Sequence, residues 1–133
     1  MISKQSEYMP LNDANKNTLD FSINVQEDRF SKLHGLMFLY IGSPKHCKNH
    51  VIEFKPGTRV QSKNYKFTYG DVERSSIILS LYNRKSFWSQ DEKIGELKIP
   101  VCDFDSYSFD TREIQFDNHG PKMTIQGLRN ESF

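Results

Sequence analysis

The aromatic side chains of residues 82–95, YNRKSFWSQDEKIG, have the types and spacing that most directly indicate an interaction. Phe87 and Trp88 stand next to each other in a polar stretch that also contains Arg84 and Lys85. A large apolar side chain left in water forgoes roughly 1.5–3 kcal/mol of burial, and exposed apolar groups mark sites of contact. An indole beside cations also suits an anionic lipid interface. Three interpretations stay open: contact with a membrane, contact with a protein, and rings folded back onto the domain.

Charge is unevenly distributed along the chain, although the net charge of the 133 residues is only +1. The segment 44–68 contains one acid, Glu53, and six cations: Lys45, Lys48, Lys55, Arg59, Lys63 and Lys66. The segment 103–118 contains Arg112 and five acids: Asp103, Asp105, Asp110, Glu113 and Asp117. This segregation predicts a dipole and a basic surface that attracts anionic partners. A solvated face with scattered charges explains the basic segment equally well, because alternate residues on a strand face opposite sides and would separate Lys63 from Lys66.

Metal-binding chemistry is suggested only by the segment 46–50, HCKNH, which holds His46, Cys47 and His50. A structural zinc site needs four ligands, usually as two spaced pairs. The other histidines, His34 and His119, form no second pair. We therefore expect no zinc site.

The sequence lacks the common signatures of catalysis. It has no Gly-rich phosphate loop, no Gly-x-Ser-x-Gly elbow and no His-Glu-x-x-His pair. Asp103 and Asp105 follow a predicted strand, where aspartates usually form turns. The near-neutral charge and the lack of an aromatic and basic face argue against nucleic-acid binding. We expect no enzyme, no cofactor, no small-molecule substrate and no nucleic-acid partner.

Short strands must position these residues. Leu19, Phe21, Ile23 and Val25 alternate with polar residues, which is the two-residue period of a half-buried strand. Residues 36–42, LMFLYIG, are apolar on both faces, as expected of a central strand. Further strands are predicted at 50–60, with a break near Pro56-Gly57, and at 65–69, 76–83, 93–101, 112–116 and 123–128.

The strand pattern predicts the fold class and the domain organisation. No stretch of ten residues shows helical spacing of its apolar side chains, and turns recur every 8 to 15 residues. We therefore predict an all-β fold, an eight-stranded antiparallel β-sandwich over residues 19–133, preceded by a polar N-terminal arm at 1–18.

The cellular compartment is predicted from the small number of cysteines and from the lack of an export or membrane-spanning segment. Its two cysteines, Cys47 and Cys102, are too few for a disulfide scaffold and are expected to be free thiols. The first twenty residues have no apolar core for export, and the longest apolar run, 36–41, is far too short to span a membrane. We expect an intracellular chain, either soluble or peripherally associated with a membrane.

The order of these segments resembles a C2 domain. The counterparts of the family pattern are LDFSINV at 19–25, HGLMFLYIG at 34–42, YKFTY at 65–69, IILSLYN at 77–83 and DEKIGELKIPVCDF at 91–104. The resemblance covers about residues 18–130. It implies a β-sandwich whose loops at one end meet calcium, lipid or protein, with residues 84–88 in a loop that dips into lipid in similar proteins. It also implies that the basic set at 45–66 lies on a face that binds phosphoinositides in some members.

The resemblance also allows the calcium-binding positions of the family to be compared with this sequence one by one. The family's acidic positions fall on Asp28 and His34 in one loop and on Asn83 and Lys85 in another, with Asp91 or Glu92 near the last position. Calcium needs six to eight oxygen ligands, and an ammonium group at Lys85 opposes it. We expect no calcium site and no other metal site.

The expected function is that of a non-catalytic, calcium-independent C2-like interaction module that acts as a structural or docking subunit of a larger protein assembly. The alternative is a peripheral membrane-binding module that recognises anionic lipids through an aromatic and basic loop. Both use Arg84, Lys85, Phe87 and Trp88.

Overall fold

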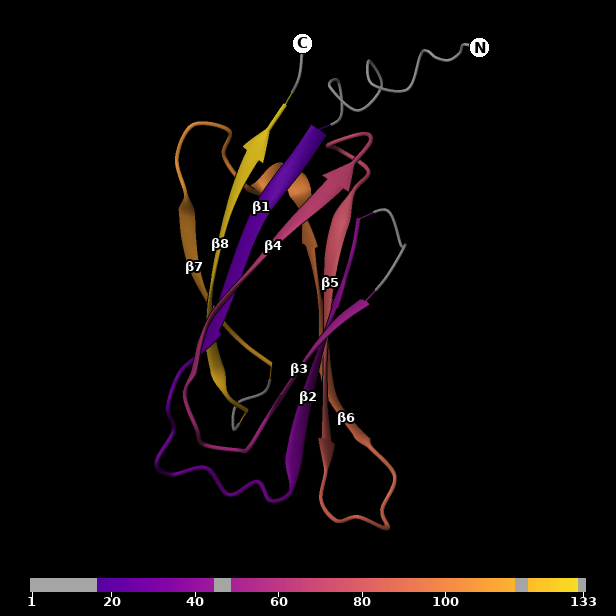
Figure 1. Cartoon of the computed structure of the whole chain (residues 1–133), viewed down its shortest axis with the longest axis vertical. Helices are drawn as coiled ribbons and strands as arrows, with labels where there is room; N and C mark the ends of the chain where they lie inside the picture. The colour runs from indigo at the N-terminus through magenta and orange to yellow at the C-terminus, as the bar shows by residue number, and fades with distance from the viewer. Residues whose placement is uncertain (1–16, 45–48, 117–119, 132–133) are drawn as a thin grey trace, which may run out of the picture.

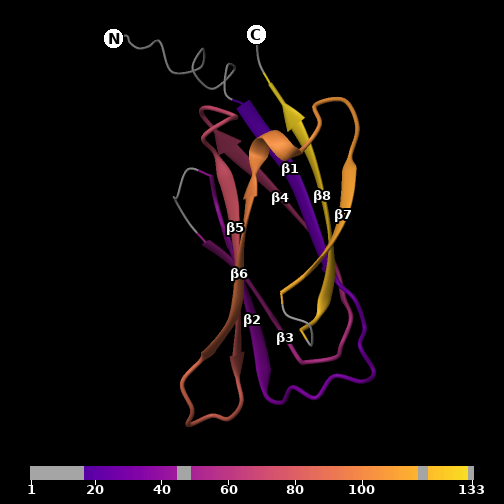
Figure 2. The same cartoon turned by 180° about the vertical axis from the view of Figure 1, so that it is seen from behind.

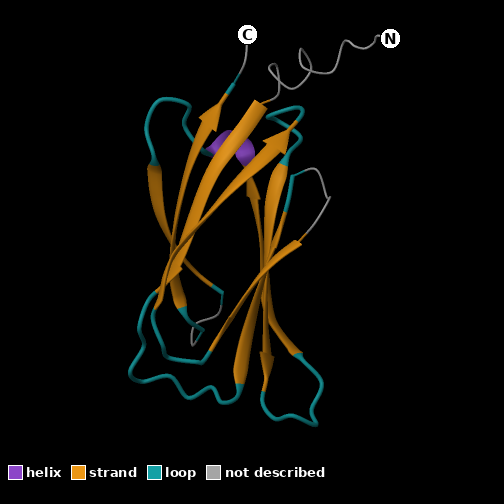
Figure 3. Cartoon of the chain, viewed as in Figure 1, coloured by secondary structure: helices purple, strands orange, loops and turns teal. Residues whose placement is uncertain are grey.

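Eight strands form two four-stranded antiparallel sheets that pack face to face (Figures 1 and 3). The computed structural model describes residues 17–44, 49–116 and 120–131. Sheet A has the order β4-β1-β8-β7 and sheet B has the order β3-β2-β5-β6. The strands are β1 (Asn17–Val25), β2 (Leu36–Gly42), β3 (Asn49–Phe54), β4 (Val60–Tyr69), β5 (Ser76–Arg84), β6 (Glu92–Pro100), β7 (Asp110–Gln115) and β8 (Lys122–Asn130). The predicted eight-stranded antiparallel sandwich is confirmed. Its described residues include one short 3-10 helix, η1 (Val101–Asp103).

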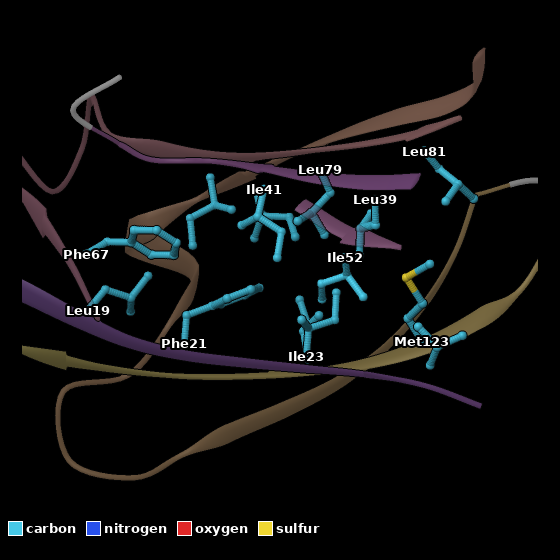
Figure 4. Packing of buried hydrophobic residues seen from close by; sticks show 14 of the residues in the cluster. Leu19, Phe21, Ile23, Leu39, Ile41, Ile52, Phe67, Leu79, Leu81 and Met123 are labelled. Atoms are coloured by element: carbon cyan, nitrogen blue, oxygen red, sulfur yellow. The ribbon is translucent and has the colours of Figure 1, made fainter. Parts of the chain in front are cut away.

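The core lies between the inner faces of the two sheets (Figure 4). The alternating residues of β1, Leu19, Phe21, Ile23 and Val25, are all buried, as their period of two predicts. They face apolar side chains of β2 and β5, including Leu39, Ile41, Leu79 and Leu81. β2 and β5 are the central strands of sheet B.

The prediction of a third strand at 50–60 is wrong for its second half. β3 ends at Phe54, and Pro56-Gly57 lies in a turn where Gly57 has a φ of +83°. Val60 begins β4 instead, and β4 pairs with β1 in the other sheet. The chain therefore crosses from sheet B to sheet A at this turn. Strand pairing stops there because proline has no N–H group to donate, and glycine adopts the left-handed φ that the turn requires.

The connections between strands divide between the two ends of the sandwich. Residues 26–35, 55–59 and 85–91 lie at the lower end in Figure 1, which we call the tip end. Residues 70–75 and 101–109 lie at the opposite end, where β1 begins and β8 ends. The view from behind in Figure 2 shows the same division. The tip end therefore collects the loops to which the sequence assigned an interaction.

Parts of the expected N-terminal arm and cysteine pair lie outside the described residues. Residues 1–16 of the arm and Cys47 lie there, whereas residues 17 and 18 already belong to β1. Cys102 is an exposed free thiol. In the part of the chain that the structure describes, no helix has the length and apolar character needed to cross a membrane.

Candidate docking surface

The aromatic pair of the tip end is held outward by a tight turn. The hydroxyl of Ser89 accepts a hydrogen bond from the backbone N–H of Ser86 (3.0 Å) and donates one to the Ser86 carbonyl (3.0 Å), which also accepts from the Ser89 N–H (3.2 Å). Phe87 and Trp88 occupy the two central positions and are 85% and 89% exposed. Their rings meet edge to face at 5.1 Å. Of the three interpretations that the sequence left open, the rings folded back onto the domain are therefore excluded, and contact with a membrane or a protein stays open.

Ion pairs close the base of this loop. Arg84 donates two hydrogen bonds to the Asp91 carboxylate (2.7 and 3.3 Å), and its guanidinium lies 4.7 Å from the centre of the Phe38 ring. The hydrogen bond and charge of Asp91 raise the pKa of Arg84 above its ordinary value. Lys85 lies 3.4 Å from Glu92 in a more exposed pair. The structure therefore brings the four predicted docking residues together, but it places Arg84 at the base of the loop rather than at its tip.

A third exposed aromatic, Phe30, projects from the loop 26–35 and was not identified from the sequence. It is 89% exposed. The Asp28 carboxylate accepts a hydrogen bond from the Phe30 N–H (3.0 Å), and the Asp28 carbonyl accepts one from the Ser31 N–H (3.3 Å). This local turn holds the ring away from the sandwich. The available signal was a lone aromatic two residues after an aspartate in the polar stretch QEDRFSKLHG.

The two aromatic loops are joined at their bases. Asn83 is fully buried, and its amide donates hydrogen bonds to the carbonyls of His34 (2.8 Å) and Leu36 (3.1 Å). Gly35 has a φ of +83°, and a Cβ atom there would collide with the carbonyl oxygen of Arg84. The backbones of the loop 26–35 and of β5 therefore approach too closely for any other residue, and the two loops start from a shared, closely packed base.

The turn at 55–59 is attached to the same end. The Asp28 N–H donates to the carbonyl of Gly57 (3.0 Å), and the Thr58 hydroxyl donates to the carbonyl of Lys55 (2.7 Å). Lys55 and Arg59 of this turn are exposed. The three connections thus form one continuous tip end.

The side chains at the expected calcium positions already have other partners. Asp28 caps a turn, Asn83 donates its amide to backbone carbonyls, and Asp91 and Glu92 are paired with Arg84 and Lys85. The Oδ1 atom of Asn83 is buried without a hydrogen-bond partner and faces the inside of the sandwich. Within residues 17–44, 49–116 and 120–131, no cluster of three metal-ligating side chains occurs.

The expected basic set does not form one patch. Lys45 and Lys48 lie outside the described residues, and Lys55 and Arg59 lie at the tip end. Lys63 and Lys66 lie on β4, with Lys63 on the side of Tyr65 and Lys66 on the outer face opposite Asp20. The described cations therefore belong to the tip end and to two sides of sheet A. The outer face of β3 carries Val51 and Glu53 instead.

The possible zinc ligands are also separated or undescribed. His46, Cys47 and His119 lie outside the described residues. His50 packs its ring against Tyr65 at 4.6 Å and Phe67 at 5.6 Å, where the edge strands β3 and β4 meet. Its role in the described structure is to close this side of the sandwich.

Charge differs between the two ends. The tip end has a net charge of +2, from Arg29, Lys32, Lys55, Arg59, Arg84 and Lys85 against Glu27, Asp28, Asp91 and Glu92. Lys32, Lys55 and Arg59 have no acidic partner within 4 Å in the described structure. The loops 70–75 and 101–109 at the opposite end carry Asp71, Glu73, Asp103 and Asp105 against Arg74, a net charge of −3. The described connections of the two ends therefore differ in charge. The predicted dipole between residues 44–68 and 103–118 stays a prediction, because Lys45, Lys48 and Asp117 lie outside the described residues.

Comparisons with known proteins identify the fold. No family model matches the chain, and no curated protein matches its sequence. Solved structures of similar shape include a C2 domain of plant extended synaptotagmin 1 (TM-score 0.57, 10% identity, 90% of this chain and 97% of that chain). Another C2 domain has a TM-score of 0.55 at 7% identity (86% and 98%). Human GIVD cytosolic phospholipase A2 has a TM-score of 0.65 at 10% identity, and the match covers 89% of this chain but only 16% of that one. The chain has the fold of a C2 domain.

Proposed function

We propose that this chain, which has the C2 fold, is a non-catalytic module that docks onto anionic membrane surfaces through its tip end without calcium. The observation that carries the proposal is that Phe30, Phe87 and Trp88, each at least 85% exposed, project from two loops at the same end of the sandwich. Three such side chains on one end are unusual for a surface that meets only water.

A planar surface accounts for the placement of the three rings better than a pocket does. The loops 26–35 and 85–91 extend from different sides of the tip end (Figures 1 and 2). A membrane accepts aromatic side chains at headgroup depth wherever they reach it. The cations without acidic partners, Lys32, Lys55 and Arg59, lie on the same end, and each contributes about 1 kcal/mol near an anionic surface.

Calcium independence is supported by the partners of the polar side chains at the tip end. Asp91 is held by Arg84 at 2.7 Å, and Glu92 lies 3.4 Å from Lys85. Binding of calcium to these carboxylates would have to break both pairs and leave two cations beside the ion. We therefore expect docking to be the same in calcium and in chelator.

The charge distribution supports one orientation of approach. Among the described connections, those of the tip end are net basic and those of the opposite end, 70–75 and 101–109, are net acidic, so an anionic surface attracts the first and repels the second. Tyr107 is 85% exposed in the loop 101–109 of the acidic end, which also carries Asp103 and Asp105. An exposed ring alone therefore does not define the surface, and Tyr107 serves as a matched control.

A second candidate is a docking subunit of a larger protein assembly that uses the same tip end. It is favoured by the rigidity of the turn 86–89, whose three hydrogen bonds fix Phe87 and Trp88 before any partner arrives. Preorganised aromatic anchors dominate many protein interfaces. Docking to a protein requires a partner with pockets that accept these side chains, whereas docking to a membrane requires only an anionic surface.

Sedimentation with vesicles tests the proposal. The purified chain is centrifuged in chelator with vesicles of neutral lipid alone and with vesicles that also contain anionic lipid. We expect pelleting only with anionic lipid, strong loss of pelleting for the double variant Phe87→Ser, Trp88→Ser, and no change for Tyr107→Ser. High salt should weaken pelleting, because it screens the cations.

The opposite results separate the two candidates. If neither the chain nor Tyr107→Ser pellets with anionic vesicles, membrane docking is wrong and the protein-assembly function takes its place. Pelleting that appears only when calcium is added, or micromolar calcium binding in calorimetry, would show that the calcium-independent part of the proposal is wrong.

A further inference from the structure

The outer face of sheet B carries more apolar side chains than the outer face of sheet A, although its edge strand β6 is polar there, with Glu96 bonded to Ser80 and Lys93. On sheet A the outward side chains form hydrogen bonds with one another, as between Gln126 and Thr111 (2.9 Å) and between Asn130 and Asp20 (2.8 Å). On sheet B the outward side chains of the three strands β3, β2 and β5 include Val51, Phe38, Tyr40, Ile78 and Tyr82, of which Phe38 is only 8% exposed, with Glu53, Ser80 and Arg84 among them. Antiparallel sheets normally turn a polar face to water, so this face is an exception.

Aromatic contacts make this face well ordered. The rings of Tyr40 and Tyr82 meet edge to face at 5.5 Å, and the Arg84 guanidinium covers the Phe38 ring at 4.7 Å. Val51 and Ile78 are 49% and 39% exposed beside them. Tyrosine, phenylalanine and arginine are the residue types enriched in protein interfaces. We call these outward side chains of sheet B the aromatic face.

The strand register arranges the aromatic face in rows, each running across four strands. One row is Glu53, Phe38, Tyr82 and Lys93, from β3 to β6. The next row is Val51, Tyr40, Ser80 and Glu96. The first row therefore has an acid at one border and a cation at the other, with two rings between them. Glu53 has no basic partner within 4 Å in the described structure, and Lys93 is paired only with Glu96 at 2.9 Å.

We infer that the aromatic face binds a second copy of this chain, in a symmetric dimer whose two-fold axis runs parallel to the strands between β2 and β5. Rotation about this axis keeps each row at its own level and reverses the order of the strands. It brings β3 of one copy opposite β6 of the other, and β2 opposite β5. Glu53 then faces Lys93 of the second copy, twice in each dimer, and Tyr82 of the second copy lies opposite the Phe38 ring and the Arg84 guanidinium that covers it.

The shape of the aromatic face fits the same arrangement. A hollow of about 330 Å³ lies between Tyr40, Ser80, Tyr82 and Asp91. The axis places Tyr40 of the second copy opposite Ser80, at this hollow. Packed sheets cross at about 30°, and the long side chains of Glu53 and Lys93 reach across the offset that this angle introduces at the borders.

The size of the aromatic face sets the expected strength of the dimer. Four strands about 4.8 Å apart span only about 19 Å across. This face buries less than the roughly 800 Å² per partner of a standard stable interface. We therefore expect a reversible dimer with a dissociation constant in the micromolar range.

The direction of the dimer axis also determines how the dimer would dock on a membrane, and this step rests on the proposed function. Because the axis runs parallel to the strands, both tip ends point in the same direction. Two tips then meet one membrane, and the second contact becomes intramolecular. The dimer itself does not depend on membrane binding, and its test uses no lipid.

The test is a pair of charge reversals measured by sedimentation equilibrium over a range of protein concentrations. We expect the chain to dimerise and Glu53→Lys or Lys93→Glu alone to weaken dimerisation about tenfold or more, because each reversal creates two repulsive contacts. An equimolar mixture of the two variants should dimerise again. In the mixed dimer, the new cation at position 53 of one variant faces the new acid at position 93 of the other, and the native pair forms at the second contact.

Matched controls separate the aromatic face from the rest of the molecule. Lys66→Glu makes the same charge change as Lys93→Glu, but on the outer face of sheet A, and should leave dimerisation unchanged. The tip variant Phe87→Ser, Trp88→Ser should also dimerise normally. Circular dichroism confirms that each variant is folded.

Three results would overturn the inference. The first is a parent chain that stays monomeric at the highest soluble concentration. The second is a dimer that survives both charge reversals, which would place the contact on another surface. The third is a mixture of the two reversed variants that fails to dimerise, which would exclude the proposed axis.

Discussion

Substitution of Phe30 tests whether both loops of the tip end meet the membrane. The side chain is 89% exposed in the free protein, so nearly all of its apolar surface is available for transfer. Full burial of a phenylalanine is worth roughly 1.5–3 kcal/mol, and partial burial at an interface about half of that. A loss of about 1.4 kcal/mol corresponds to tenfold in the binding constant. Half of the full burial is about 0.75–1.5 kcal/mol, so we expect Phe30→Ser to weaken binding to anionic vesicles about four- to tenfold.

The assay uses Trp88, which is the only tryptophan of the chain. Its emission reports the loop 85–91 directly, because 89% of the residue faces water before binding. Titration with anionic vesicles should move the emission to shorter wavelength. Phe30→Ser should shift the titration to higher lipid concentration and leave the emission at saturation unchanged, because the loop 85–91 still enters the interface.

Two results would refute this reasoning. Equal binding of Phe30→Ser and the parent chain would mean that the loop 26–35 does not reach the membrane. A Trp88 emission that stays constant while the protein pellets with vesicles would mean that another surface binds lipid. Tyr107→Ser, which removes an equally exposed ring from the acidic end, provides the control and should titrate like the parent.

Two further predictions concern the stability of the regions that carry these surfaces. Gly35→Ala should destabilise the fold by about 3 kcal/mol or more in urea denaturation, because it combines a left-handed φ with a collision against the Arg84 carbonyl; a loss below about 1 kcal/mol, the cost of the φ alone, would show that the two loops are not closely joined. The hydrogen bonds from Lys93 and Ser80 lower the pKa of Glu96, so the stability that this group adds is present above the ordinary glutamate pKa and is lost as the pH falls through the lowered value. The thermal midpoint of Lys93→Gln should therefore lie further below that of the parent at pH 7 than at pH 3, and an equal difference at both pH values would contradict the pairing.

The strands could be predicted from the sequence because their signal is local. Leu19, Phe21, Ile23 and Val25 alternate with polar residues, and this period of two is enough to define β1 and its buried face. The prediction of one strand at 50–60 failed because the sequence pattern of two strands in different sheets, separated by a short turn, resembles that of one interrupted strand. Pro56-Gly57 indicated a break, but only the pairing of β4 with β1 shows that the chain crosses there.

The candidate site was predicted only in part. Phe87 and Trp88 stood out as adjacent large aromatic residues in a polar segment, whereas Phe30 stands alone and gave a weaker signal. The six cations at 45–66 looked like one surface because they are close in sequence. Four of them lie in the described residues, and the crossing between sheets separates these between the tip end and two sides of β4.

The sequence by itself determined that this protein is an eight-stranded β-protein with an exposed aromatic loop, because alternation and turn residues act within a few positions of each other. The tertiary structure decided which loops share an end and which side chains form rows across a sheet. β1 pairs with β4 and β8, and β2 pairs with β5, over sequence separations of 35 residues or more. Such long-range pairing depends on the packing of the whole core, so the tip end and the aromatic face exist only once the sandwich has closed.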